Sequence, residues 1–153
     1  MRIHILCVGK RPRDWVGGAT NDYLKRLTGH LDIAVRDVPP MTHSSRKTQC
    51  DKEAVRLTKI CPSGAFKIAL DERGQQWSTK ELSANLDRWR SEYSDVACFI
   101  GGAQGLAESL VGSADHKWSL SRLTLPHQLA RVVLIEQLYR AWTVLKNHPY
   151  HRA

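Results

Sequence analysis

The sequence contains few cysteines, and none stands at a spacing that binds metal or carries redox chemistry. Its four cysteines occupy positions 7, 50, 61 and 98, so there is no CxxC pair. Cys7 and Cys98 lie within apolar runs, where a cysteine usually behaves as a small core residue. Zinc-knuckle and thioredoxin-type chemistry are therefore unsupported, and we expect a reduced, cytosolic protein.

Long hydrophobic runs are also missing. No stretch approaches the roughly 18 apolar residues that a membrane-spanning helix needs, and the first residues lack the apolar region of a signal peptide. Several motifs are absent too, among them GxxxxGK[ST], HExxH, GxSxG and an early GxGxxG. These absences exclude a P-loop and leave dinucleotide binding, zinc-peptidase and hydrolase functions without support.

Positive charge is concentrated toward the two ends of the chain. The 153 residues are 42% hydrophobic and carry a formal net charge of +8, which fits a single folded domain over residues 1–153. Basic residues outnumber acidic ones nine to four in residues 1–50 and six to three in 101–153, but are balanced eight to eight in 51–100. Ends that meet in space or across a dimer would form a patch suited to a polyanion; a solubilising surface charge is the alternative.

Strand-like and helix-like patterns alternate along the chain. The apolar run 96–100 predicts a central strand covered on both faces. Residues 41–48 are expected to form a mobile polar loop, and Asp71–Gly74 a turn after the third strand. Predicted strands cover 3–8, 33–38, 66–70 and 96–100, and predicted helices cover 15–27, 51–61, 78–91 and 128–147, the third opened by a capping box at Ser78 and Glu81. This order predicts an α/β fold with a mainly parallel sheet flanked by helices.

Three loops are expected to meet where ligands bind in such folds, beyond the carboxyl ends of the strands. They follow Leu70, contain Gly101–Gly105, or lie in Leu120–Pro126. The GGxxG turn lets a backbone approach a ligand closely, although a tight turn explains it equally well. Leu120–Pro126 offers main-chain groups for an adenine and apolar side chains for a thioether arm; an edge strand is the alternative.

The last predicted helix, residues 128–147, is apolar around most of its circumference. A helix of this kind must be buried on nearly every side, which in a small domain favours a two-fold homodimer interface. Arg140 follows Glu136 in the favourable i,i+4 order, so an ion pair and a role in substrate binding are both open. His127 is expected to cap this helix.

The tail Asn147-His148-Pro149-Tyr150-His151-Arg152 gathers groups that have no packing reason to stand at a chain end. An aromatic ring with basic neighbours suits an unpaired base stacked on Tyr150, with Arg152 on a phosphate. Disorder of the last residues is the alternative. Metal binding is not favoured, because no carboxylate or cysteine accompanies the two histidines.

Seven motifs run along the chain in a recognisable order: Val8-Gly9-Lys10, Leu70-Asp71, Gly101-Gly102-x-x-Gly105, Leu123-Thr124-Leu125-Pro126-His127, Arg131-Val132, Glu136-Gln137-x-Tyr139-Arg140-Ala141 and Tyr150-His151-Arg152. Together they resemble the bacterial large-subunit ribosomal RNA pseudouridine N3-methyltransferases, which belong to the SPOUT superfamily. The resemblance covers the chain essentially from end to end.

The resemblance implies a C-terminal trefoil knot, an exception to unknotted connectivity, and a cytoplasmic homodimer that binds S-adenosylmethionine in the knot and needs no metal. It implies a pseudouridine of 23S rRNA, within the assembled ribosome, as the substrate. The implied donor contacts are Leu70, Gly101, Gly102, Gly105, Leu120, Ser121, Arg122, Leu123, Thr124 and Leu125.

The tail and the last helix supply the expected catalytic groups. We expect His151 to act as the base or to orient it, and Tyr150 to stack on the target. Arg140 and Arg152 are expected to bind the developing anion and phosphate. A SPOUT methyltransferase with another RNA target and a non-catalytic ribosome-binding module are the alternatives. The two candidate donor loops favour an enzyme, because a binding module needs no cofactor pocket.

Overall fold

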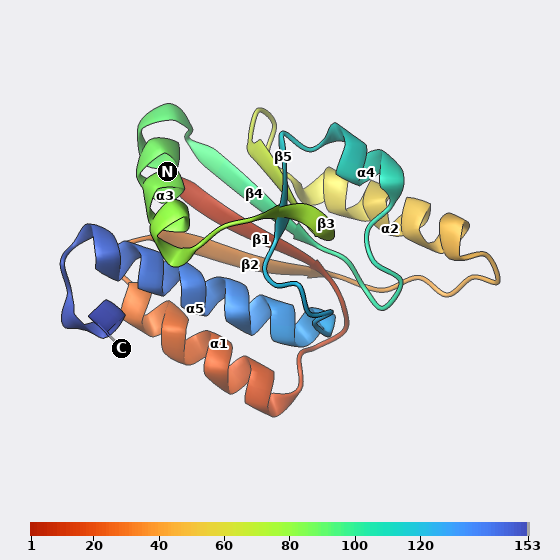
Figure 1. The fold of residues 1–153 in the computed structure, drawn as a ribbon. Helices are drawn as coiled ribbons and strands as arrows, with labels where there is room; N and C mark the ends of the chain where they lie inside the picture. Colours follow the sequence, from red (N-terminus) through yellow and green to blue (C-terminus); the bar gives the residue numbers. More distant parts are fainter. Residues whose placement is uncertain (153) are drawn as a thin grey trace.

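A five-stranded parallel sheet runs through the middle of the protein (Figure 1). The computed structural model describes the backbone of residues 1–152 and the side chains of residues 1–150. The strands are β1 (Arg2–Val8), β2 (Asp32–Val38), β3 (Phe66–Gln76), β4 (Asp95–Ile100) and β5 (His116–Ser119). The helices are α1 (Asp14–Leu27), α2 (Arg46–Ile60), α3 (Thr79–Glu92), α4 (Glu108–Ser113) and α5 (His127–Leu145), followed by the 3₁₀ turn η1 (Pro149–Arg152).

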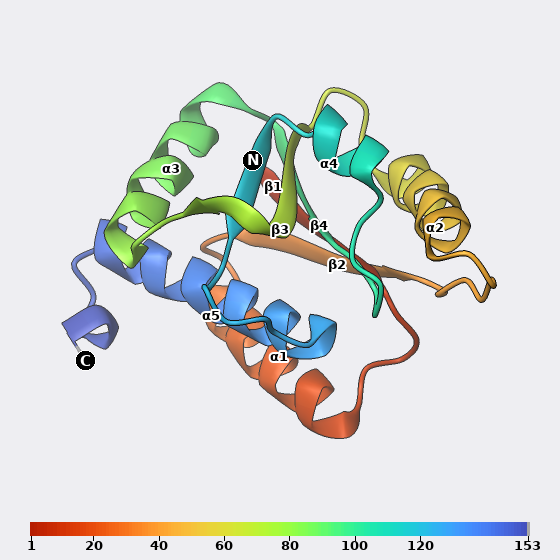
Figure 2. The ribbon, with the colours of Figure 1, turned by 45° about the vertical axis from the view of Figure 1, so that its right-hand side comes forward.

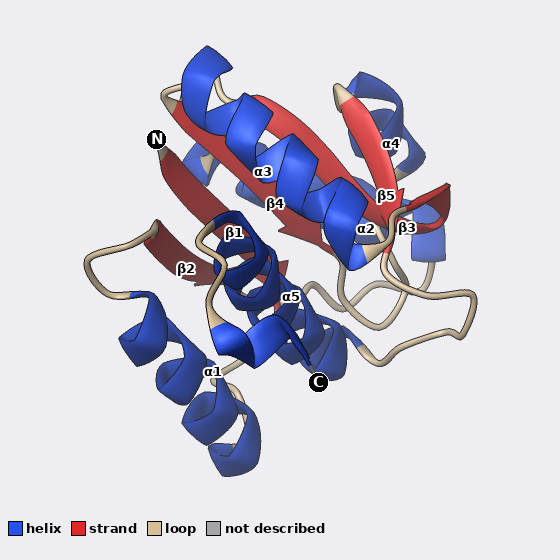
Figure 3. Ribbon diagram, turned by 60° about the vertical axis from the view of Figure 1, so that its left-hand side comes forward, coloured by secondary structure: helices blue, strands red, loops and turns tan. Residues whose placement is uncertain are grey.

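The strands lie in the order β2-β1-β4-β3-β5, and every pair is parallel. Helices α1, α3 and α5 cover one face of the sheet, while α2 and α4 cover the other (Figures 2 and 3). Side chains of β1 point alternately to the two faces of the sheet. Ile3 and Ile5 belong to the core under α1, α3 and α5, while Leu6 and Val8 belong to the core under α2 and α4. The predicted α/β architecture with a parallel sheet is confirmed.

Strand β4 is the central strand that its apolar run predicted. It pairs with β1 on one side and β3 on the other, and residues 96–100 are all buried. Helix α3 begins where the capping box predicted. The Ser78 hydroxyl accepts the Glu81 N–H at 3.2 Å, and the Glu81 carboxylate accepts the Ser78 N–H at 2.6 Å.

Helix α2 begins five residues earlier than predicted, at Arg46. The Ser45 hydroxyl accepts the Thr48 N–H at 3.3 Å and caps the first turn. The prediction of a polar loop over 41–48 is therefore wrong for residues 46–48, because a serine cap can start a helix where the sequence has no apolar periodicity.

Strand β3 does not turn away after Leu70, as the sequence predicted. Its pairing with β5 shifts register between Leu70 and Gln75 and then resumes opposite Trp118. Asp71–Gly74 is therefore a bulge inside one long strand, which bends the strand without ending it.

Two short elements that the sequence reading did not predict, α4 and β5, connect β4 to the last helix. They have six and four residues, too few to display a clear period. Pairing of β5 with β3 ends at Ser119, so residues 120–126 form a loop and not an edge strand.

Helix α5 packs between α1 and α3, and none of its residues is fully exposed. Buried Arg131 anchors it to the sheet by an ion pair with Asp37. The helix ends at Leu145, two residues before the predicted end, since Asn147 adopts a left-handed conformation with φ of 51°. None of the helices in residues 1–152 combines the length and apolar character that a membrane crossing requires.

Candidate functional site

A cleft of about 530 Å³ opens at the carboxyl edge of the sheet, within the size range of small-molecule sites. Three segments line it: residues 70–73 at the bulge of β3, residues 100–106 at the end of β4 and after it, and residues 118–127, except Arg122 and Pro126, from β5 to the start of α5. Arg46 lies at the rim. The three predicted loops do meet at one sheet edge.

The loop after β4 has no room for side chains at its base. A Cβ on Gly101 would lie 2.4 Å from the carbonyl carbon of Gly105, closer than real Cβ contacts allow. Gly105 has φ of +83°, a conformation that glycine adopts without strain, and its N–H donates to the Gly102 carbonyl at 3.0 Å. The GGxxG segment is thus a tight turn and a wall of the cleft at once.

One face of α2 holds this turn in place. The Arg46 guanidinium donates to the Gln104 carbonyl at 3.0 and 3.2 Å, and the Cys50 thiol lies 3.7 Å from the same oxygen. Burial raises the pKa of the Cys50 thiol, so it stays protonated and able to donate. Buried Glu53, one turn further on, lies beside Gly102. The turn is therefore anchored before any ligand enters.

The β3 side of the cleft carries an ionised carboxylate. Asp71 accepts hydrogen bonds at 2.9 Å from the backbone and the guanidinium of Arg73, and these bonds lower the pKa of Asp71. Arg73 also reaches Glu108 of α4 at 2.9 Å. Asp71, Arg73 and Glu108 together leave one net negative charge at this wall, which complements a positively charged ligand.

The segment after β5 is shaped by its own hydroxyls. The Ser119 hydroxyl donates to the Ser121 carbonyl and the Ser121 hydroxyl accepts the Leu123 N–H, both at 2.9 Å. Thr124 reaches Glu72 across the cleft at 3.3 Å. These bonds leave the apolar side chains of 120–125 beside main-chain groups, as an adenine and a thioether would require.

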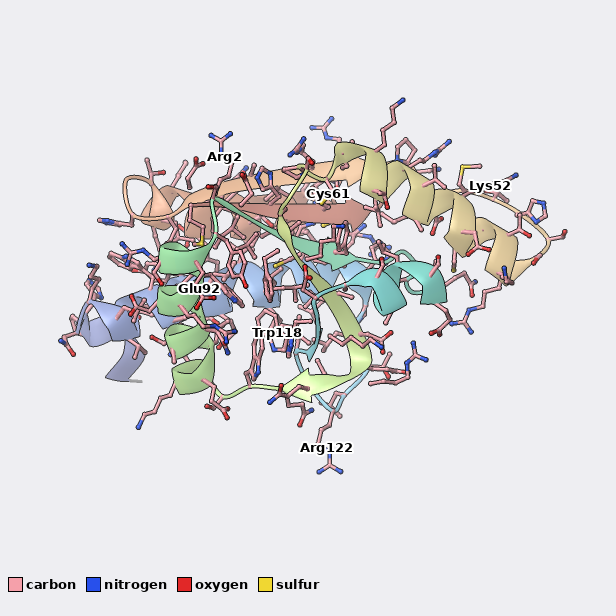
Figure 4. All side chains as sticks on the ribbon, turned by 90° about the horizontal axis from the view of Figure 1, so that it is seen from above. Arg2, Lys52, Cys61, Glu92, Trp118 and Arg122 are labelled. Carbon is pink, nitrogen blue, oxygen red and sulfur yellow. The ribbon has the colours of Figure 1, made fainter. Side chains whose placement is uncertain are left out.

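Nine of the ten residues predicted to contact a methyl donor line this cleft: Leu70, Gly101, Gly102, Gly105, Leu120, Ser121, Leu123, Thr124 and Leu125. Arg122 is exposed and its side chain points away from the body of the protein (Figure 4), so only its backbone can contribute. His127 does not cap α5, because Pro126 occupies the N-cap position, and its side chain lines the cleft instead.

The lining residues outside the predicted donor contacts include Arg46 and Trp118. Arg46 falls where the sequence predicted a loop, and Trp118 lies in a strand too short to recognise. The serine before Arg46 was the available signal for a helix start. Among the described residues, no group of three or more His, Cys, Asp or Glu could hold a metal ion.

The tail packs onto α5 instead of extending freely. The Tyr150 hydroxyl lies 3.2 Å from the Glu136 carboxylate and 3.3 Å from the Tyr23 hydroxyl. Arg140 lies 4.8 Å above the Tyr150 ring, and Tyr139 meets that ring edge-on at 4.7 Å. Burial and these neighbours raise the pKa of Tyr150, so the phenol stays protonated at neutral pH.

Arg140 makes the ion pair that its spacing from Glu136 suggested, at 2.8 Å. One face of the Tyr150 ring is therefore covered by a guanidinium that is itself held in place. The side chains of His151 and Arg152, the other predicted catalytic residues, lie outside the described residues.

We call Glu136, Tyr139, Arg140 and Tyr150 the tail cluster. The cleft and the tail cluster lie at different ends of α5. Ala130 lines the cleft, whereas Arg140 lies ten residues further on, a rise of about 15 Å along the helix axis. The predicted donor residues are brought together, and so are Arg140 and Tyr150. The two groups do not meet within one chain.

Comparison with known proteins agrees with this architecture. A family model described as predicted SPOUT methyltransferase matches residues 1–151. The chain belongs to the SPOUT methyltransferase family. The family resemblance inferred from the seven motifs is confirmed.

Curated SPOUT relatives match over the whole chain. A protein of Polynucleobacter asymbioticus named ribosomal RNA large subunit methyltransferase H is 47% identical over 152 residues, covering 99% of both chains. A protein of Bordetella avium with the same name is 46% identical and covers 100% of both. Among solved structures, a probable methylase family protein from Haemophilus influenzae matches with a TM-score of 0.57 at 13% identity, covering 97% of this chain and 69% of that one. That likeness concerns the fold.

Proposed function

We propose that this SPOUT protein is an S-adenosylmethionine-dependent methyltransferase that modifies N3 of a pseudouridine in 23S rRNA, on the assembled ribosome. The observation that carries the proposal is the cleft, which three loops form at the carboxyl edge of the sheet, in a chain that matches SPOUT methyltransferases over residues 1–151. The names of the relatives support ribosomal RNA of the large subunit as the substrate. A ribosomal substrate also implies a cytoplasmic location.

The cleft residues fit a methyl donor of this type. Leu70, Leu120 and Leu125 offer an apolar wall, and the backbone of 120–125 offers donors and acceptors for an adenine. The tight turn at Gly101 lets the backbone approach closely, and the net negative charge of Asp71, Arg73 and Glu108 complements positive charge. When bound, S-adenosylmethionine supplies a methyl group already activated on a sulfonium, so no metal is required.

We also propose that the C-terminal part of the chain forms a trefoil knot. The three segments that line the cleft come from separate parts of the chain between residues 70 and 127, and the chain passes from α4 on one face of the sheet to α5 on the other through β5 and residues 120–126. This arrangement supports a trefoil knot with the donor site inside it, within a single domain over residues 1–153.

The acceptor side needs a group that removes the N3 proton and a positive charge that stabilises the resulting anion. Arg140 supplies a charge whose position is fixed by Glu136 and by the Tyr150 ring. We assign His151 as the base or its orienting group, Arg152 to phosphate, and Tyr150 to stacking on the target. Holding the acceptor in line can contribute roughly 7–11 kcal/mol to the lowering of the barrier.

The separation along α5 supports a homodimer in which the tail of one subunit serves the cleft of the other. The outward side of α5 is half-buried and largely apolar, with Leu129, Val132, Val133 and Val144 available to a partner. A two-fold axis at this surface would place each tail near the opposite cleft. The active site would then be complete only in the dimer.

Methyl transfer to ribosomes from cells that lack the protein tests the proposal, read out by mass mapping of rRNA nucleosides. We expect one added methyl group, on a pseudouridine of 23S rRNA, that appears only when the protein is supplied. A methyl group on another RNA would mean a different substrate. Ribosome binding without any donor binding would instead favour a non-catalytic module.

A further inference from the structure

The loop between β1 and α1 carries an exposed basic and aromatic surface. Lys10, Arg11 and Arg13 are exposed, and the Trp15 residue is 54% exposed. We call these four residues the basic edge. The other four tryptophans of the chain are buried or half-buried, so packing does not explain Trp15.

The basic edge borders the cleft. Gly9 lies beside the His127 ring, about 4.0 Å from where a Cβ would stand, and His127 lines the cleft. The Arg13 N–H donates to the Gln128 side chain at 3.5 Å. Figures 1 and 2 both show the loop leaving β1 and passing the first turn of α5. A molecule bound at the cleft mouth would therefore meet this loop in the same subunit.

The three cations of the basic edge form no ion pair within the described part of the chain. Among the described residues, Lys10, Arg11 and Arg13 have no carboxylate within 4.0 Å, whereas Arg2, Arg26 and Arg73 each pair with one. The nearest acidic residue in sequence, Asp14, stands in the first turn of α1, where a negative charge favours the helix dipole. The three cations are left for an external anion.

We propose that Lys10, Arg11 and Arg13 bind phosphates of the RNA that flanks the target nucleotide, and that Trp15 stacks on an unpaired base. This rests on the proposed function. Closely spaced cations on one loop can follow a phosphate backbone, and an exposed indole offers a face that any base can stack on. In this arrangement the tail cluster binds the nucleotide to be methylated, and the basic edge binds the RNA that flanks it.

Two variants test the proposal, K10A/R11A/R13A and Trp15→Ala. A matched control, K25A/K59A/R90A, removes the same charge from the last turns of α1, α2 and α3, where these exposed residues also lack an acidic partner among the described residues. The assays are binding to salt-washed ribosomes, steady-state methylation, and calorimetry with S-adenosylmethionine alone.

We expect the basic-edge triple variant to raise KM for ribosomes at least about tenfold, with little change in kcat and unchanged donor affinity. Its binding should depend less on salt, with the slope smaller by about two to three. Trp15→Ala should raise KM several-fold while Trp15→Phe restores most of it, because phenylalanine retains a stacking face. The control triple should bind ribosomes as the natural chain does.

Equal KM values for the basic-edge and control variants would overturn the proposal. A lowered melting temperature or a weakened donor affinity of the basic-edge variant would also overturn it, because the loop would then have a structural role. Ultraviolet crosslinks from the basic edge to a ribosomal protein instead of RNA would also overturn it. If the natural chain methylates no ribosomal RNA, the proposed function fails, while ribosome binding by the variants still decides the role of the surface.

Discussion

At the scale of single residues, the cleft depends on a position where any side chain is too large. Gly101→Ala would force its Cβ against the backbone of Gly105 at 2.4 Å, and a backbone neighbour cannot move aside cheaply. We expect this variant to weaken S-adenosylmethionine binding at least about tenfold, since the turn that forms the wall must open. Calorimetry measures this. Gly112→Ala is the control, because nothing lies within 4 Å of its Cβ; equal affinities would show that the turn does not shape the site.

His116 gives the fold a dependence on pH. Its ring stacks on Trp77 at 4.5 Å, and its Nε2 is buried without a partner among the described residues. Burial, helped by Arg88, lowers the pKa of His116. The unfolded chain therefore binds a proton more readily, so stability falls as pH drops below the unfolded value of about 6.5.

We expect the melting temperature to fall between pH 7.5 and pH 5.5, and to fall less in His116→Gln, which cannot be protonated. Tryptophan fluorescence follows the transition, since Trp77 stacks on this ring and Trp118 lies beside Trp77. An identical pH dependence in both chains would assign the effect to other histidines.

At the scale of elements, the tail and the cleft are predicted to have separable roles. Deleting residues 148–153 should abolish methylation and change donor affinity by less than about twofold, because the tail packs beside Glu136 and Arg140, away from the cleft. Calorimetry and methyl-transfer assays compare the two effects. His148→Ala is the control for the exposed part of the tail. Loss of donor binding in the deletion would contradict the separation.

The elements that could be predicted from sequence are those with a strong local signal. The apolar run of β4 and the capping box of α3 each carry their own physical cause, and both are confirmed. Helix α2 began earlier than expected, because its first turn is polar and stabilised by one serine. The bulge in β3 and the strand β5 depend on pairing with each other, a non-local interaction that no single segment encodes.

The position of the candidate site could also be predicted from the sequence, but some of its residues could not. Parallel strands bring their carboxyl ends to one edge, so the meeting of the loops at Leu70, Gly101 and Leu120 followed from fold class alone. The contribution of Arg46 did not, since it depends on where α2 starts. The distance between the cleft and Tyr150 needed the structure, because a sequence does not show which way a tail turns.

At the scale of the whole molecule, the site is predicted to be shared between two copies. A chain with Gly101→Ala keeps its tail, and a chain lacking 148–153 keeps its cleft. At a donor concentration too low to fill the Gly101→Ala cleft, each chain alone should be nearly inactive. Mixing the two chains through partial unfolding and refolding should then restore roughly a quarter of the natural activity, because half of randomly paired dimers are mixed and each holds one complete site.

Activity of the mixture is compared with that of each variant refolded alone, and sedimentation establishes the oligomeric state. A mixture as inactive as its components would mean that each chain serves its own cleft. Sedimentation of the natural chain as a monomer would contradict the shared site directly.

The three segments that wall the cleft are widely spaced along the chain, the first near residue 70 and the last reaching residue 127. During synthesis, the site cannot exist until the C-terminal segment has left the ribosome. Contacts between such distant segments also form late and slowly in folding. A methyl donor would therefore bind only chains that have completed folding, and an excess of donor would stabilise them by a free energy that grows with the logarithm of its concentration. A complete cleft is thus present only in chains whose C-terminal segment has reached its folded position.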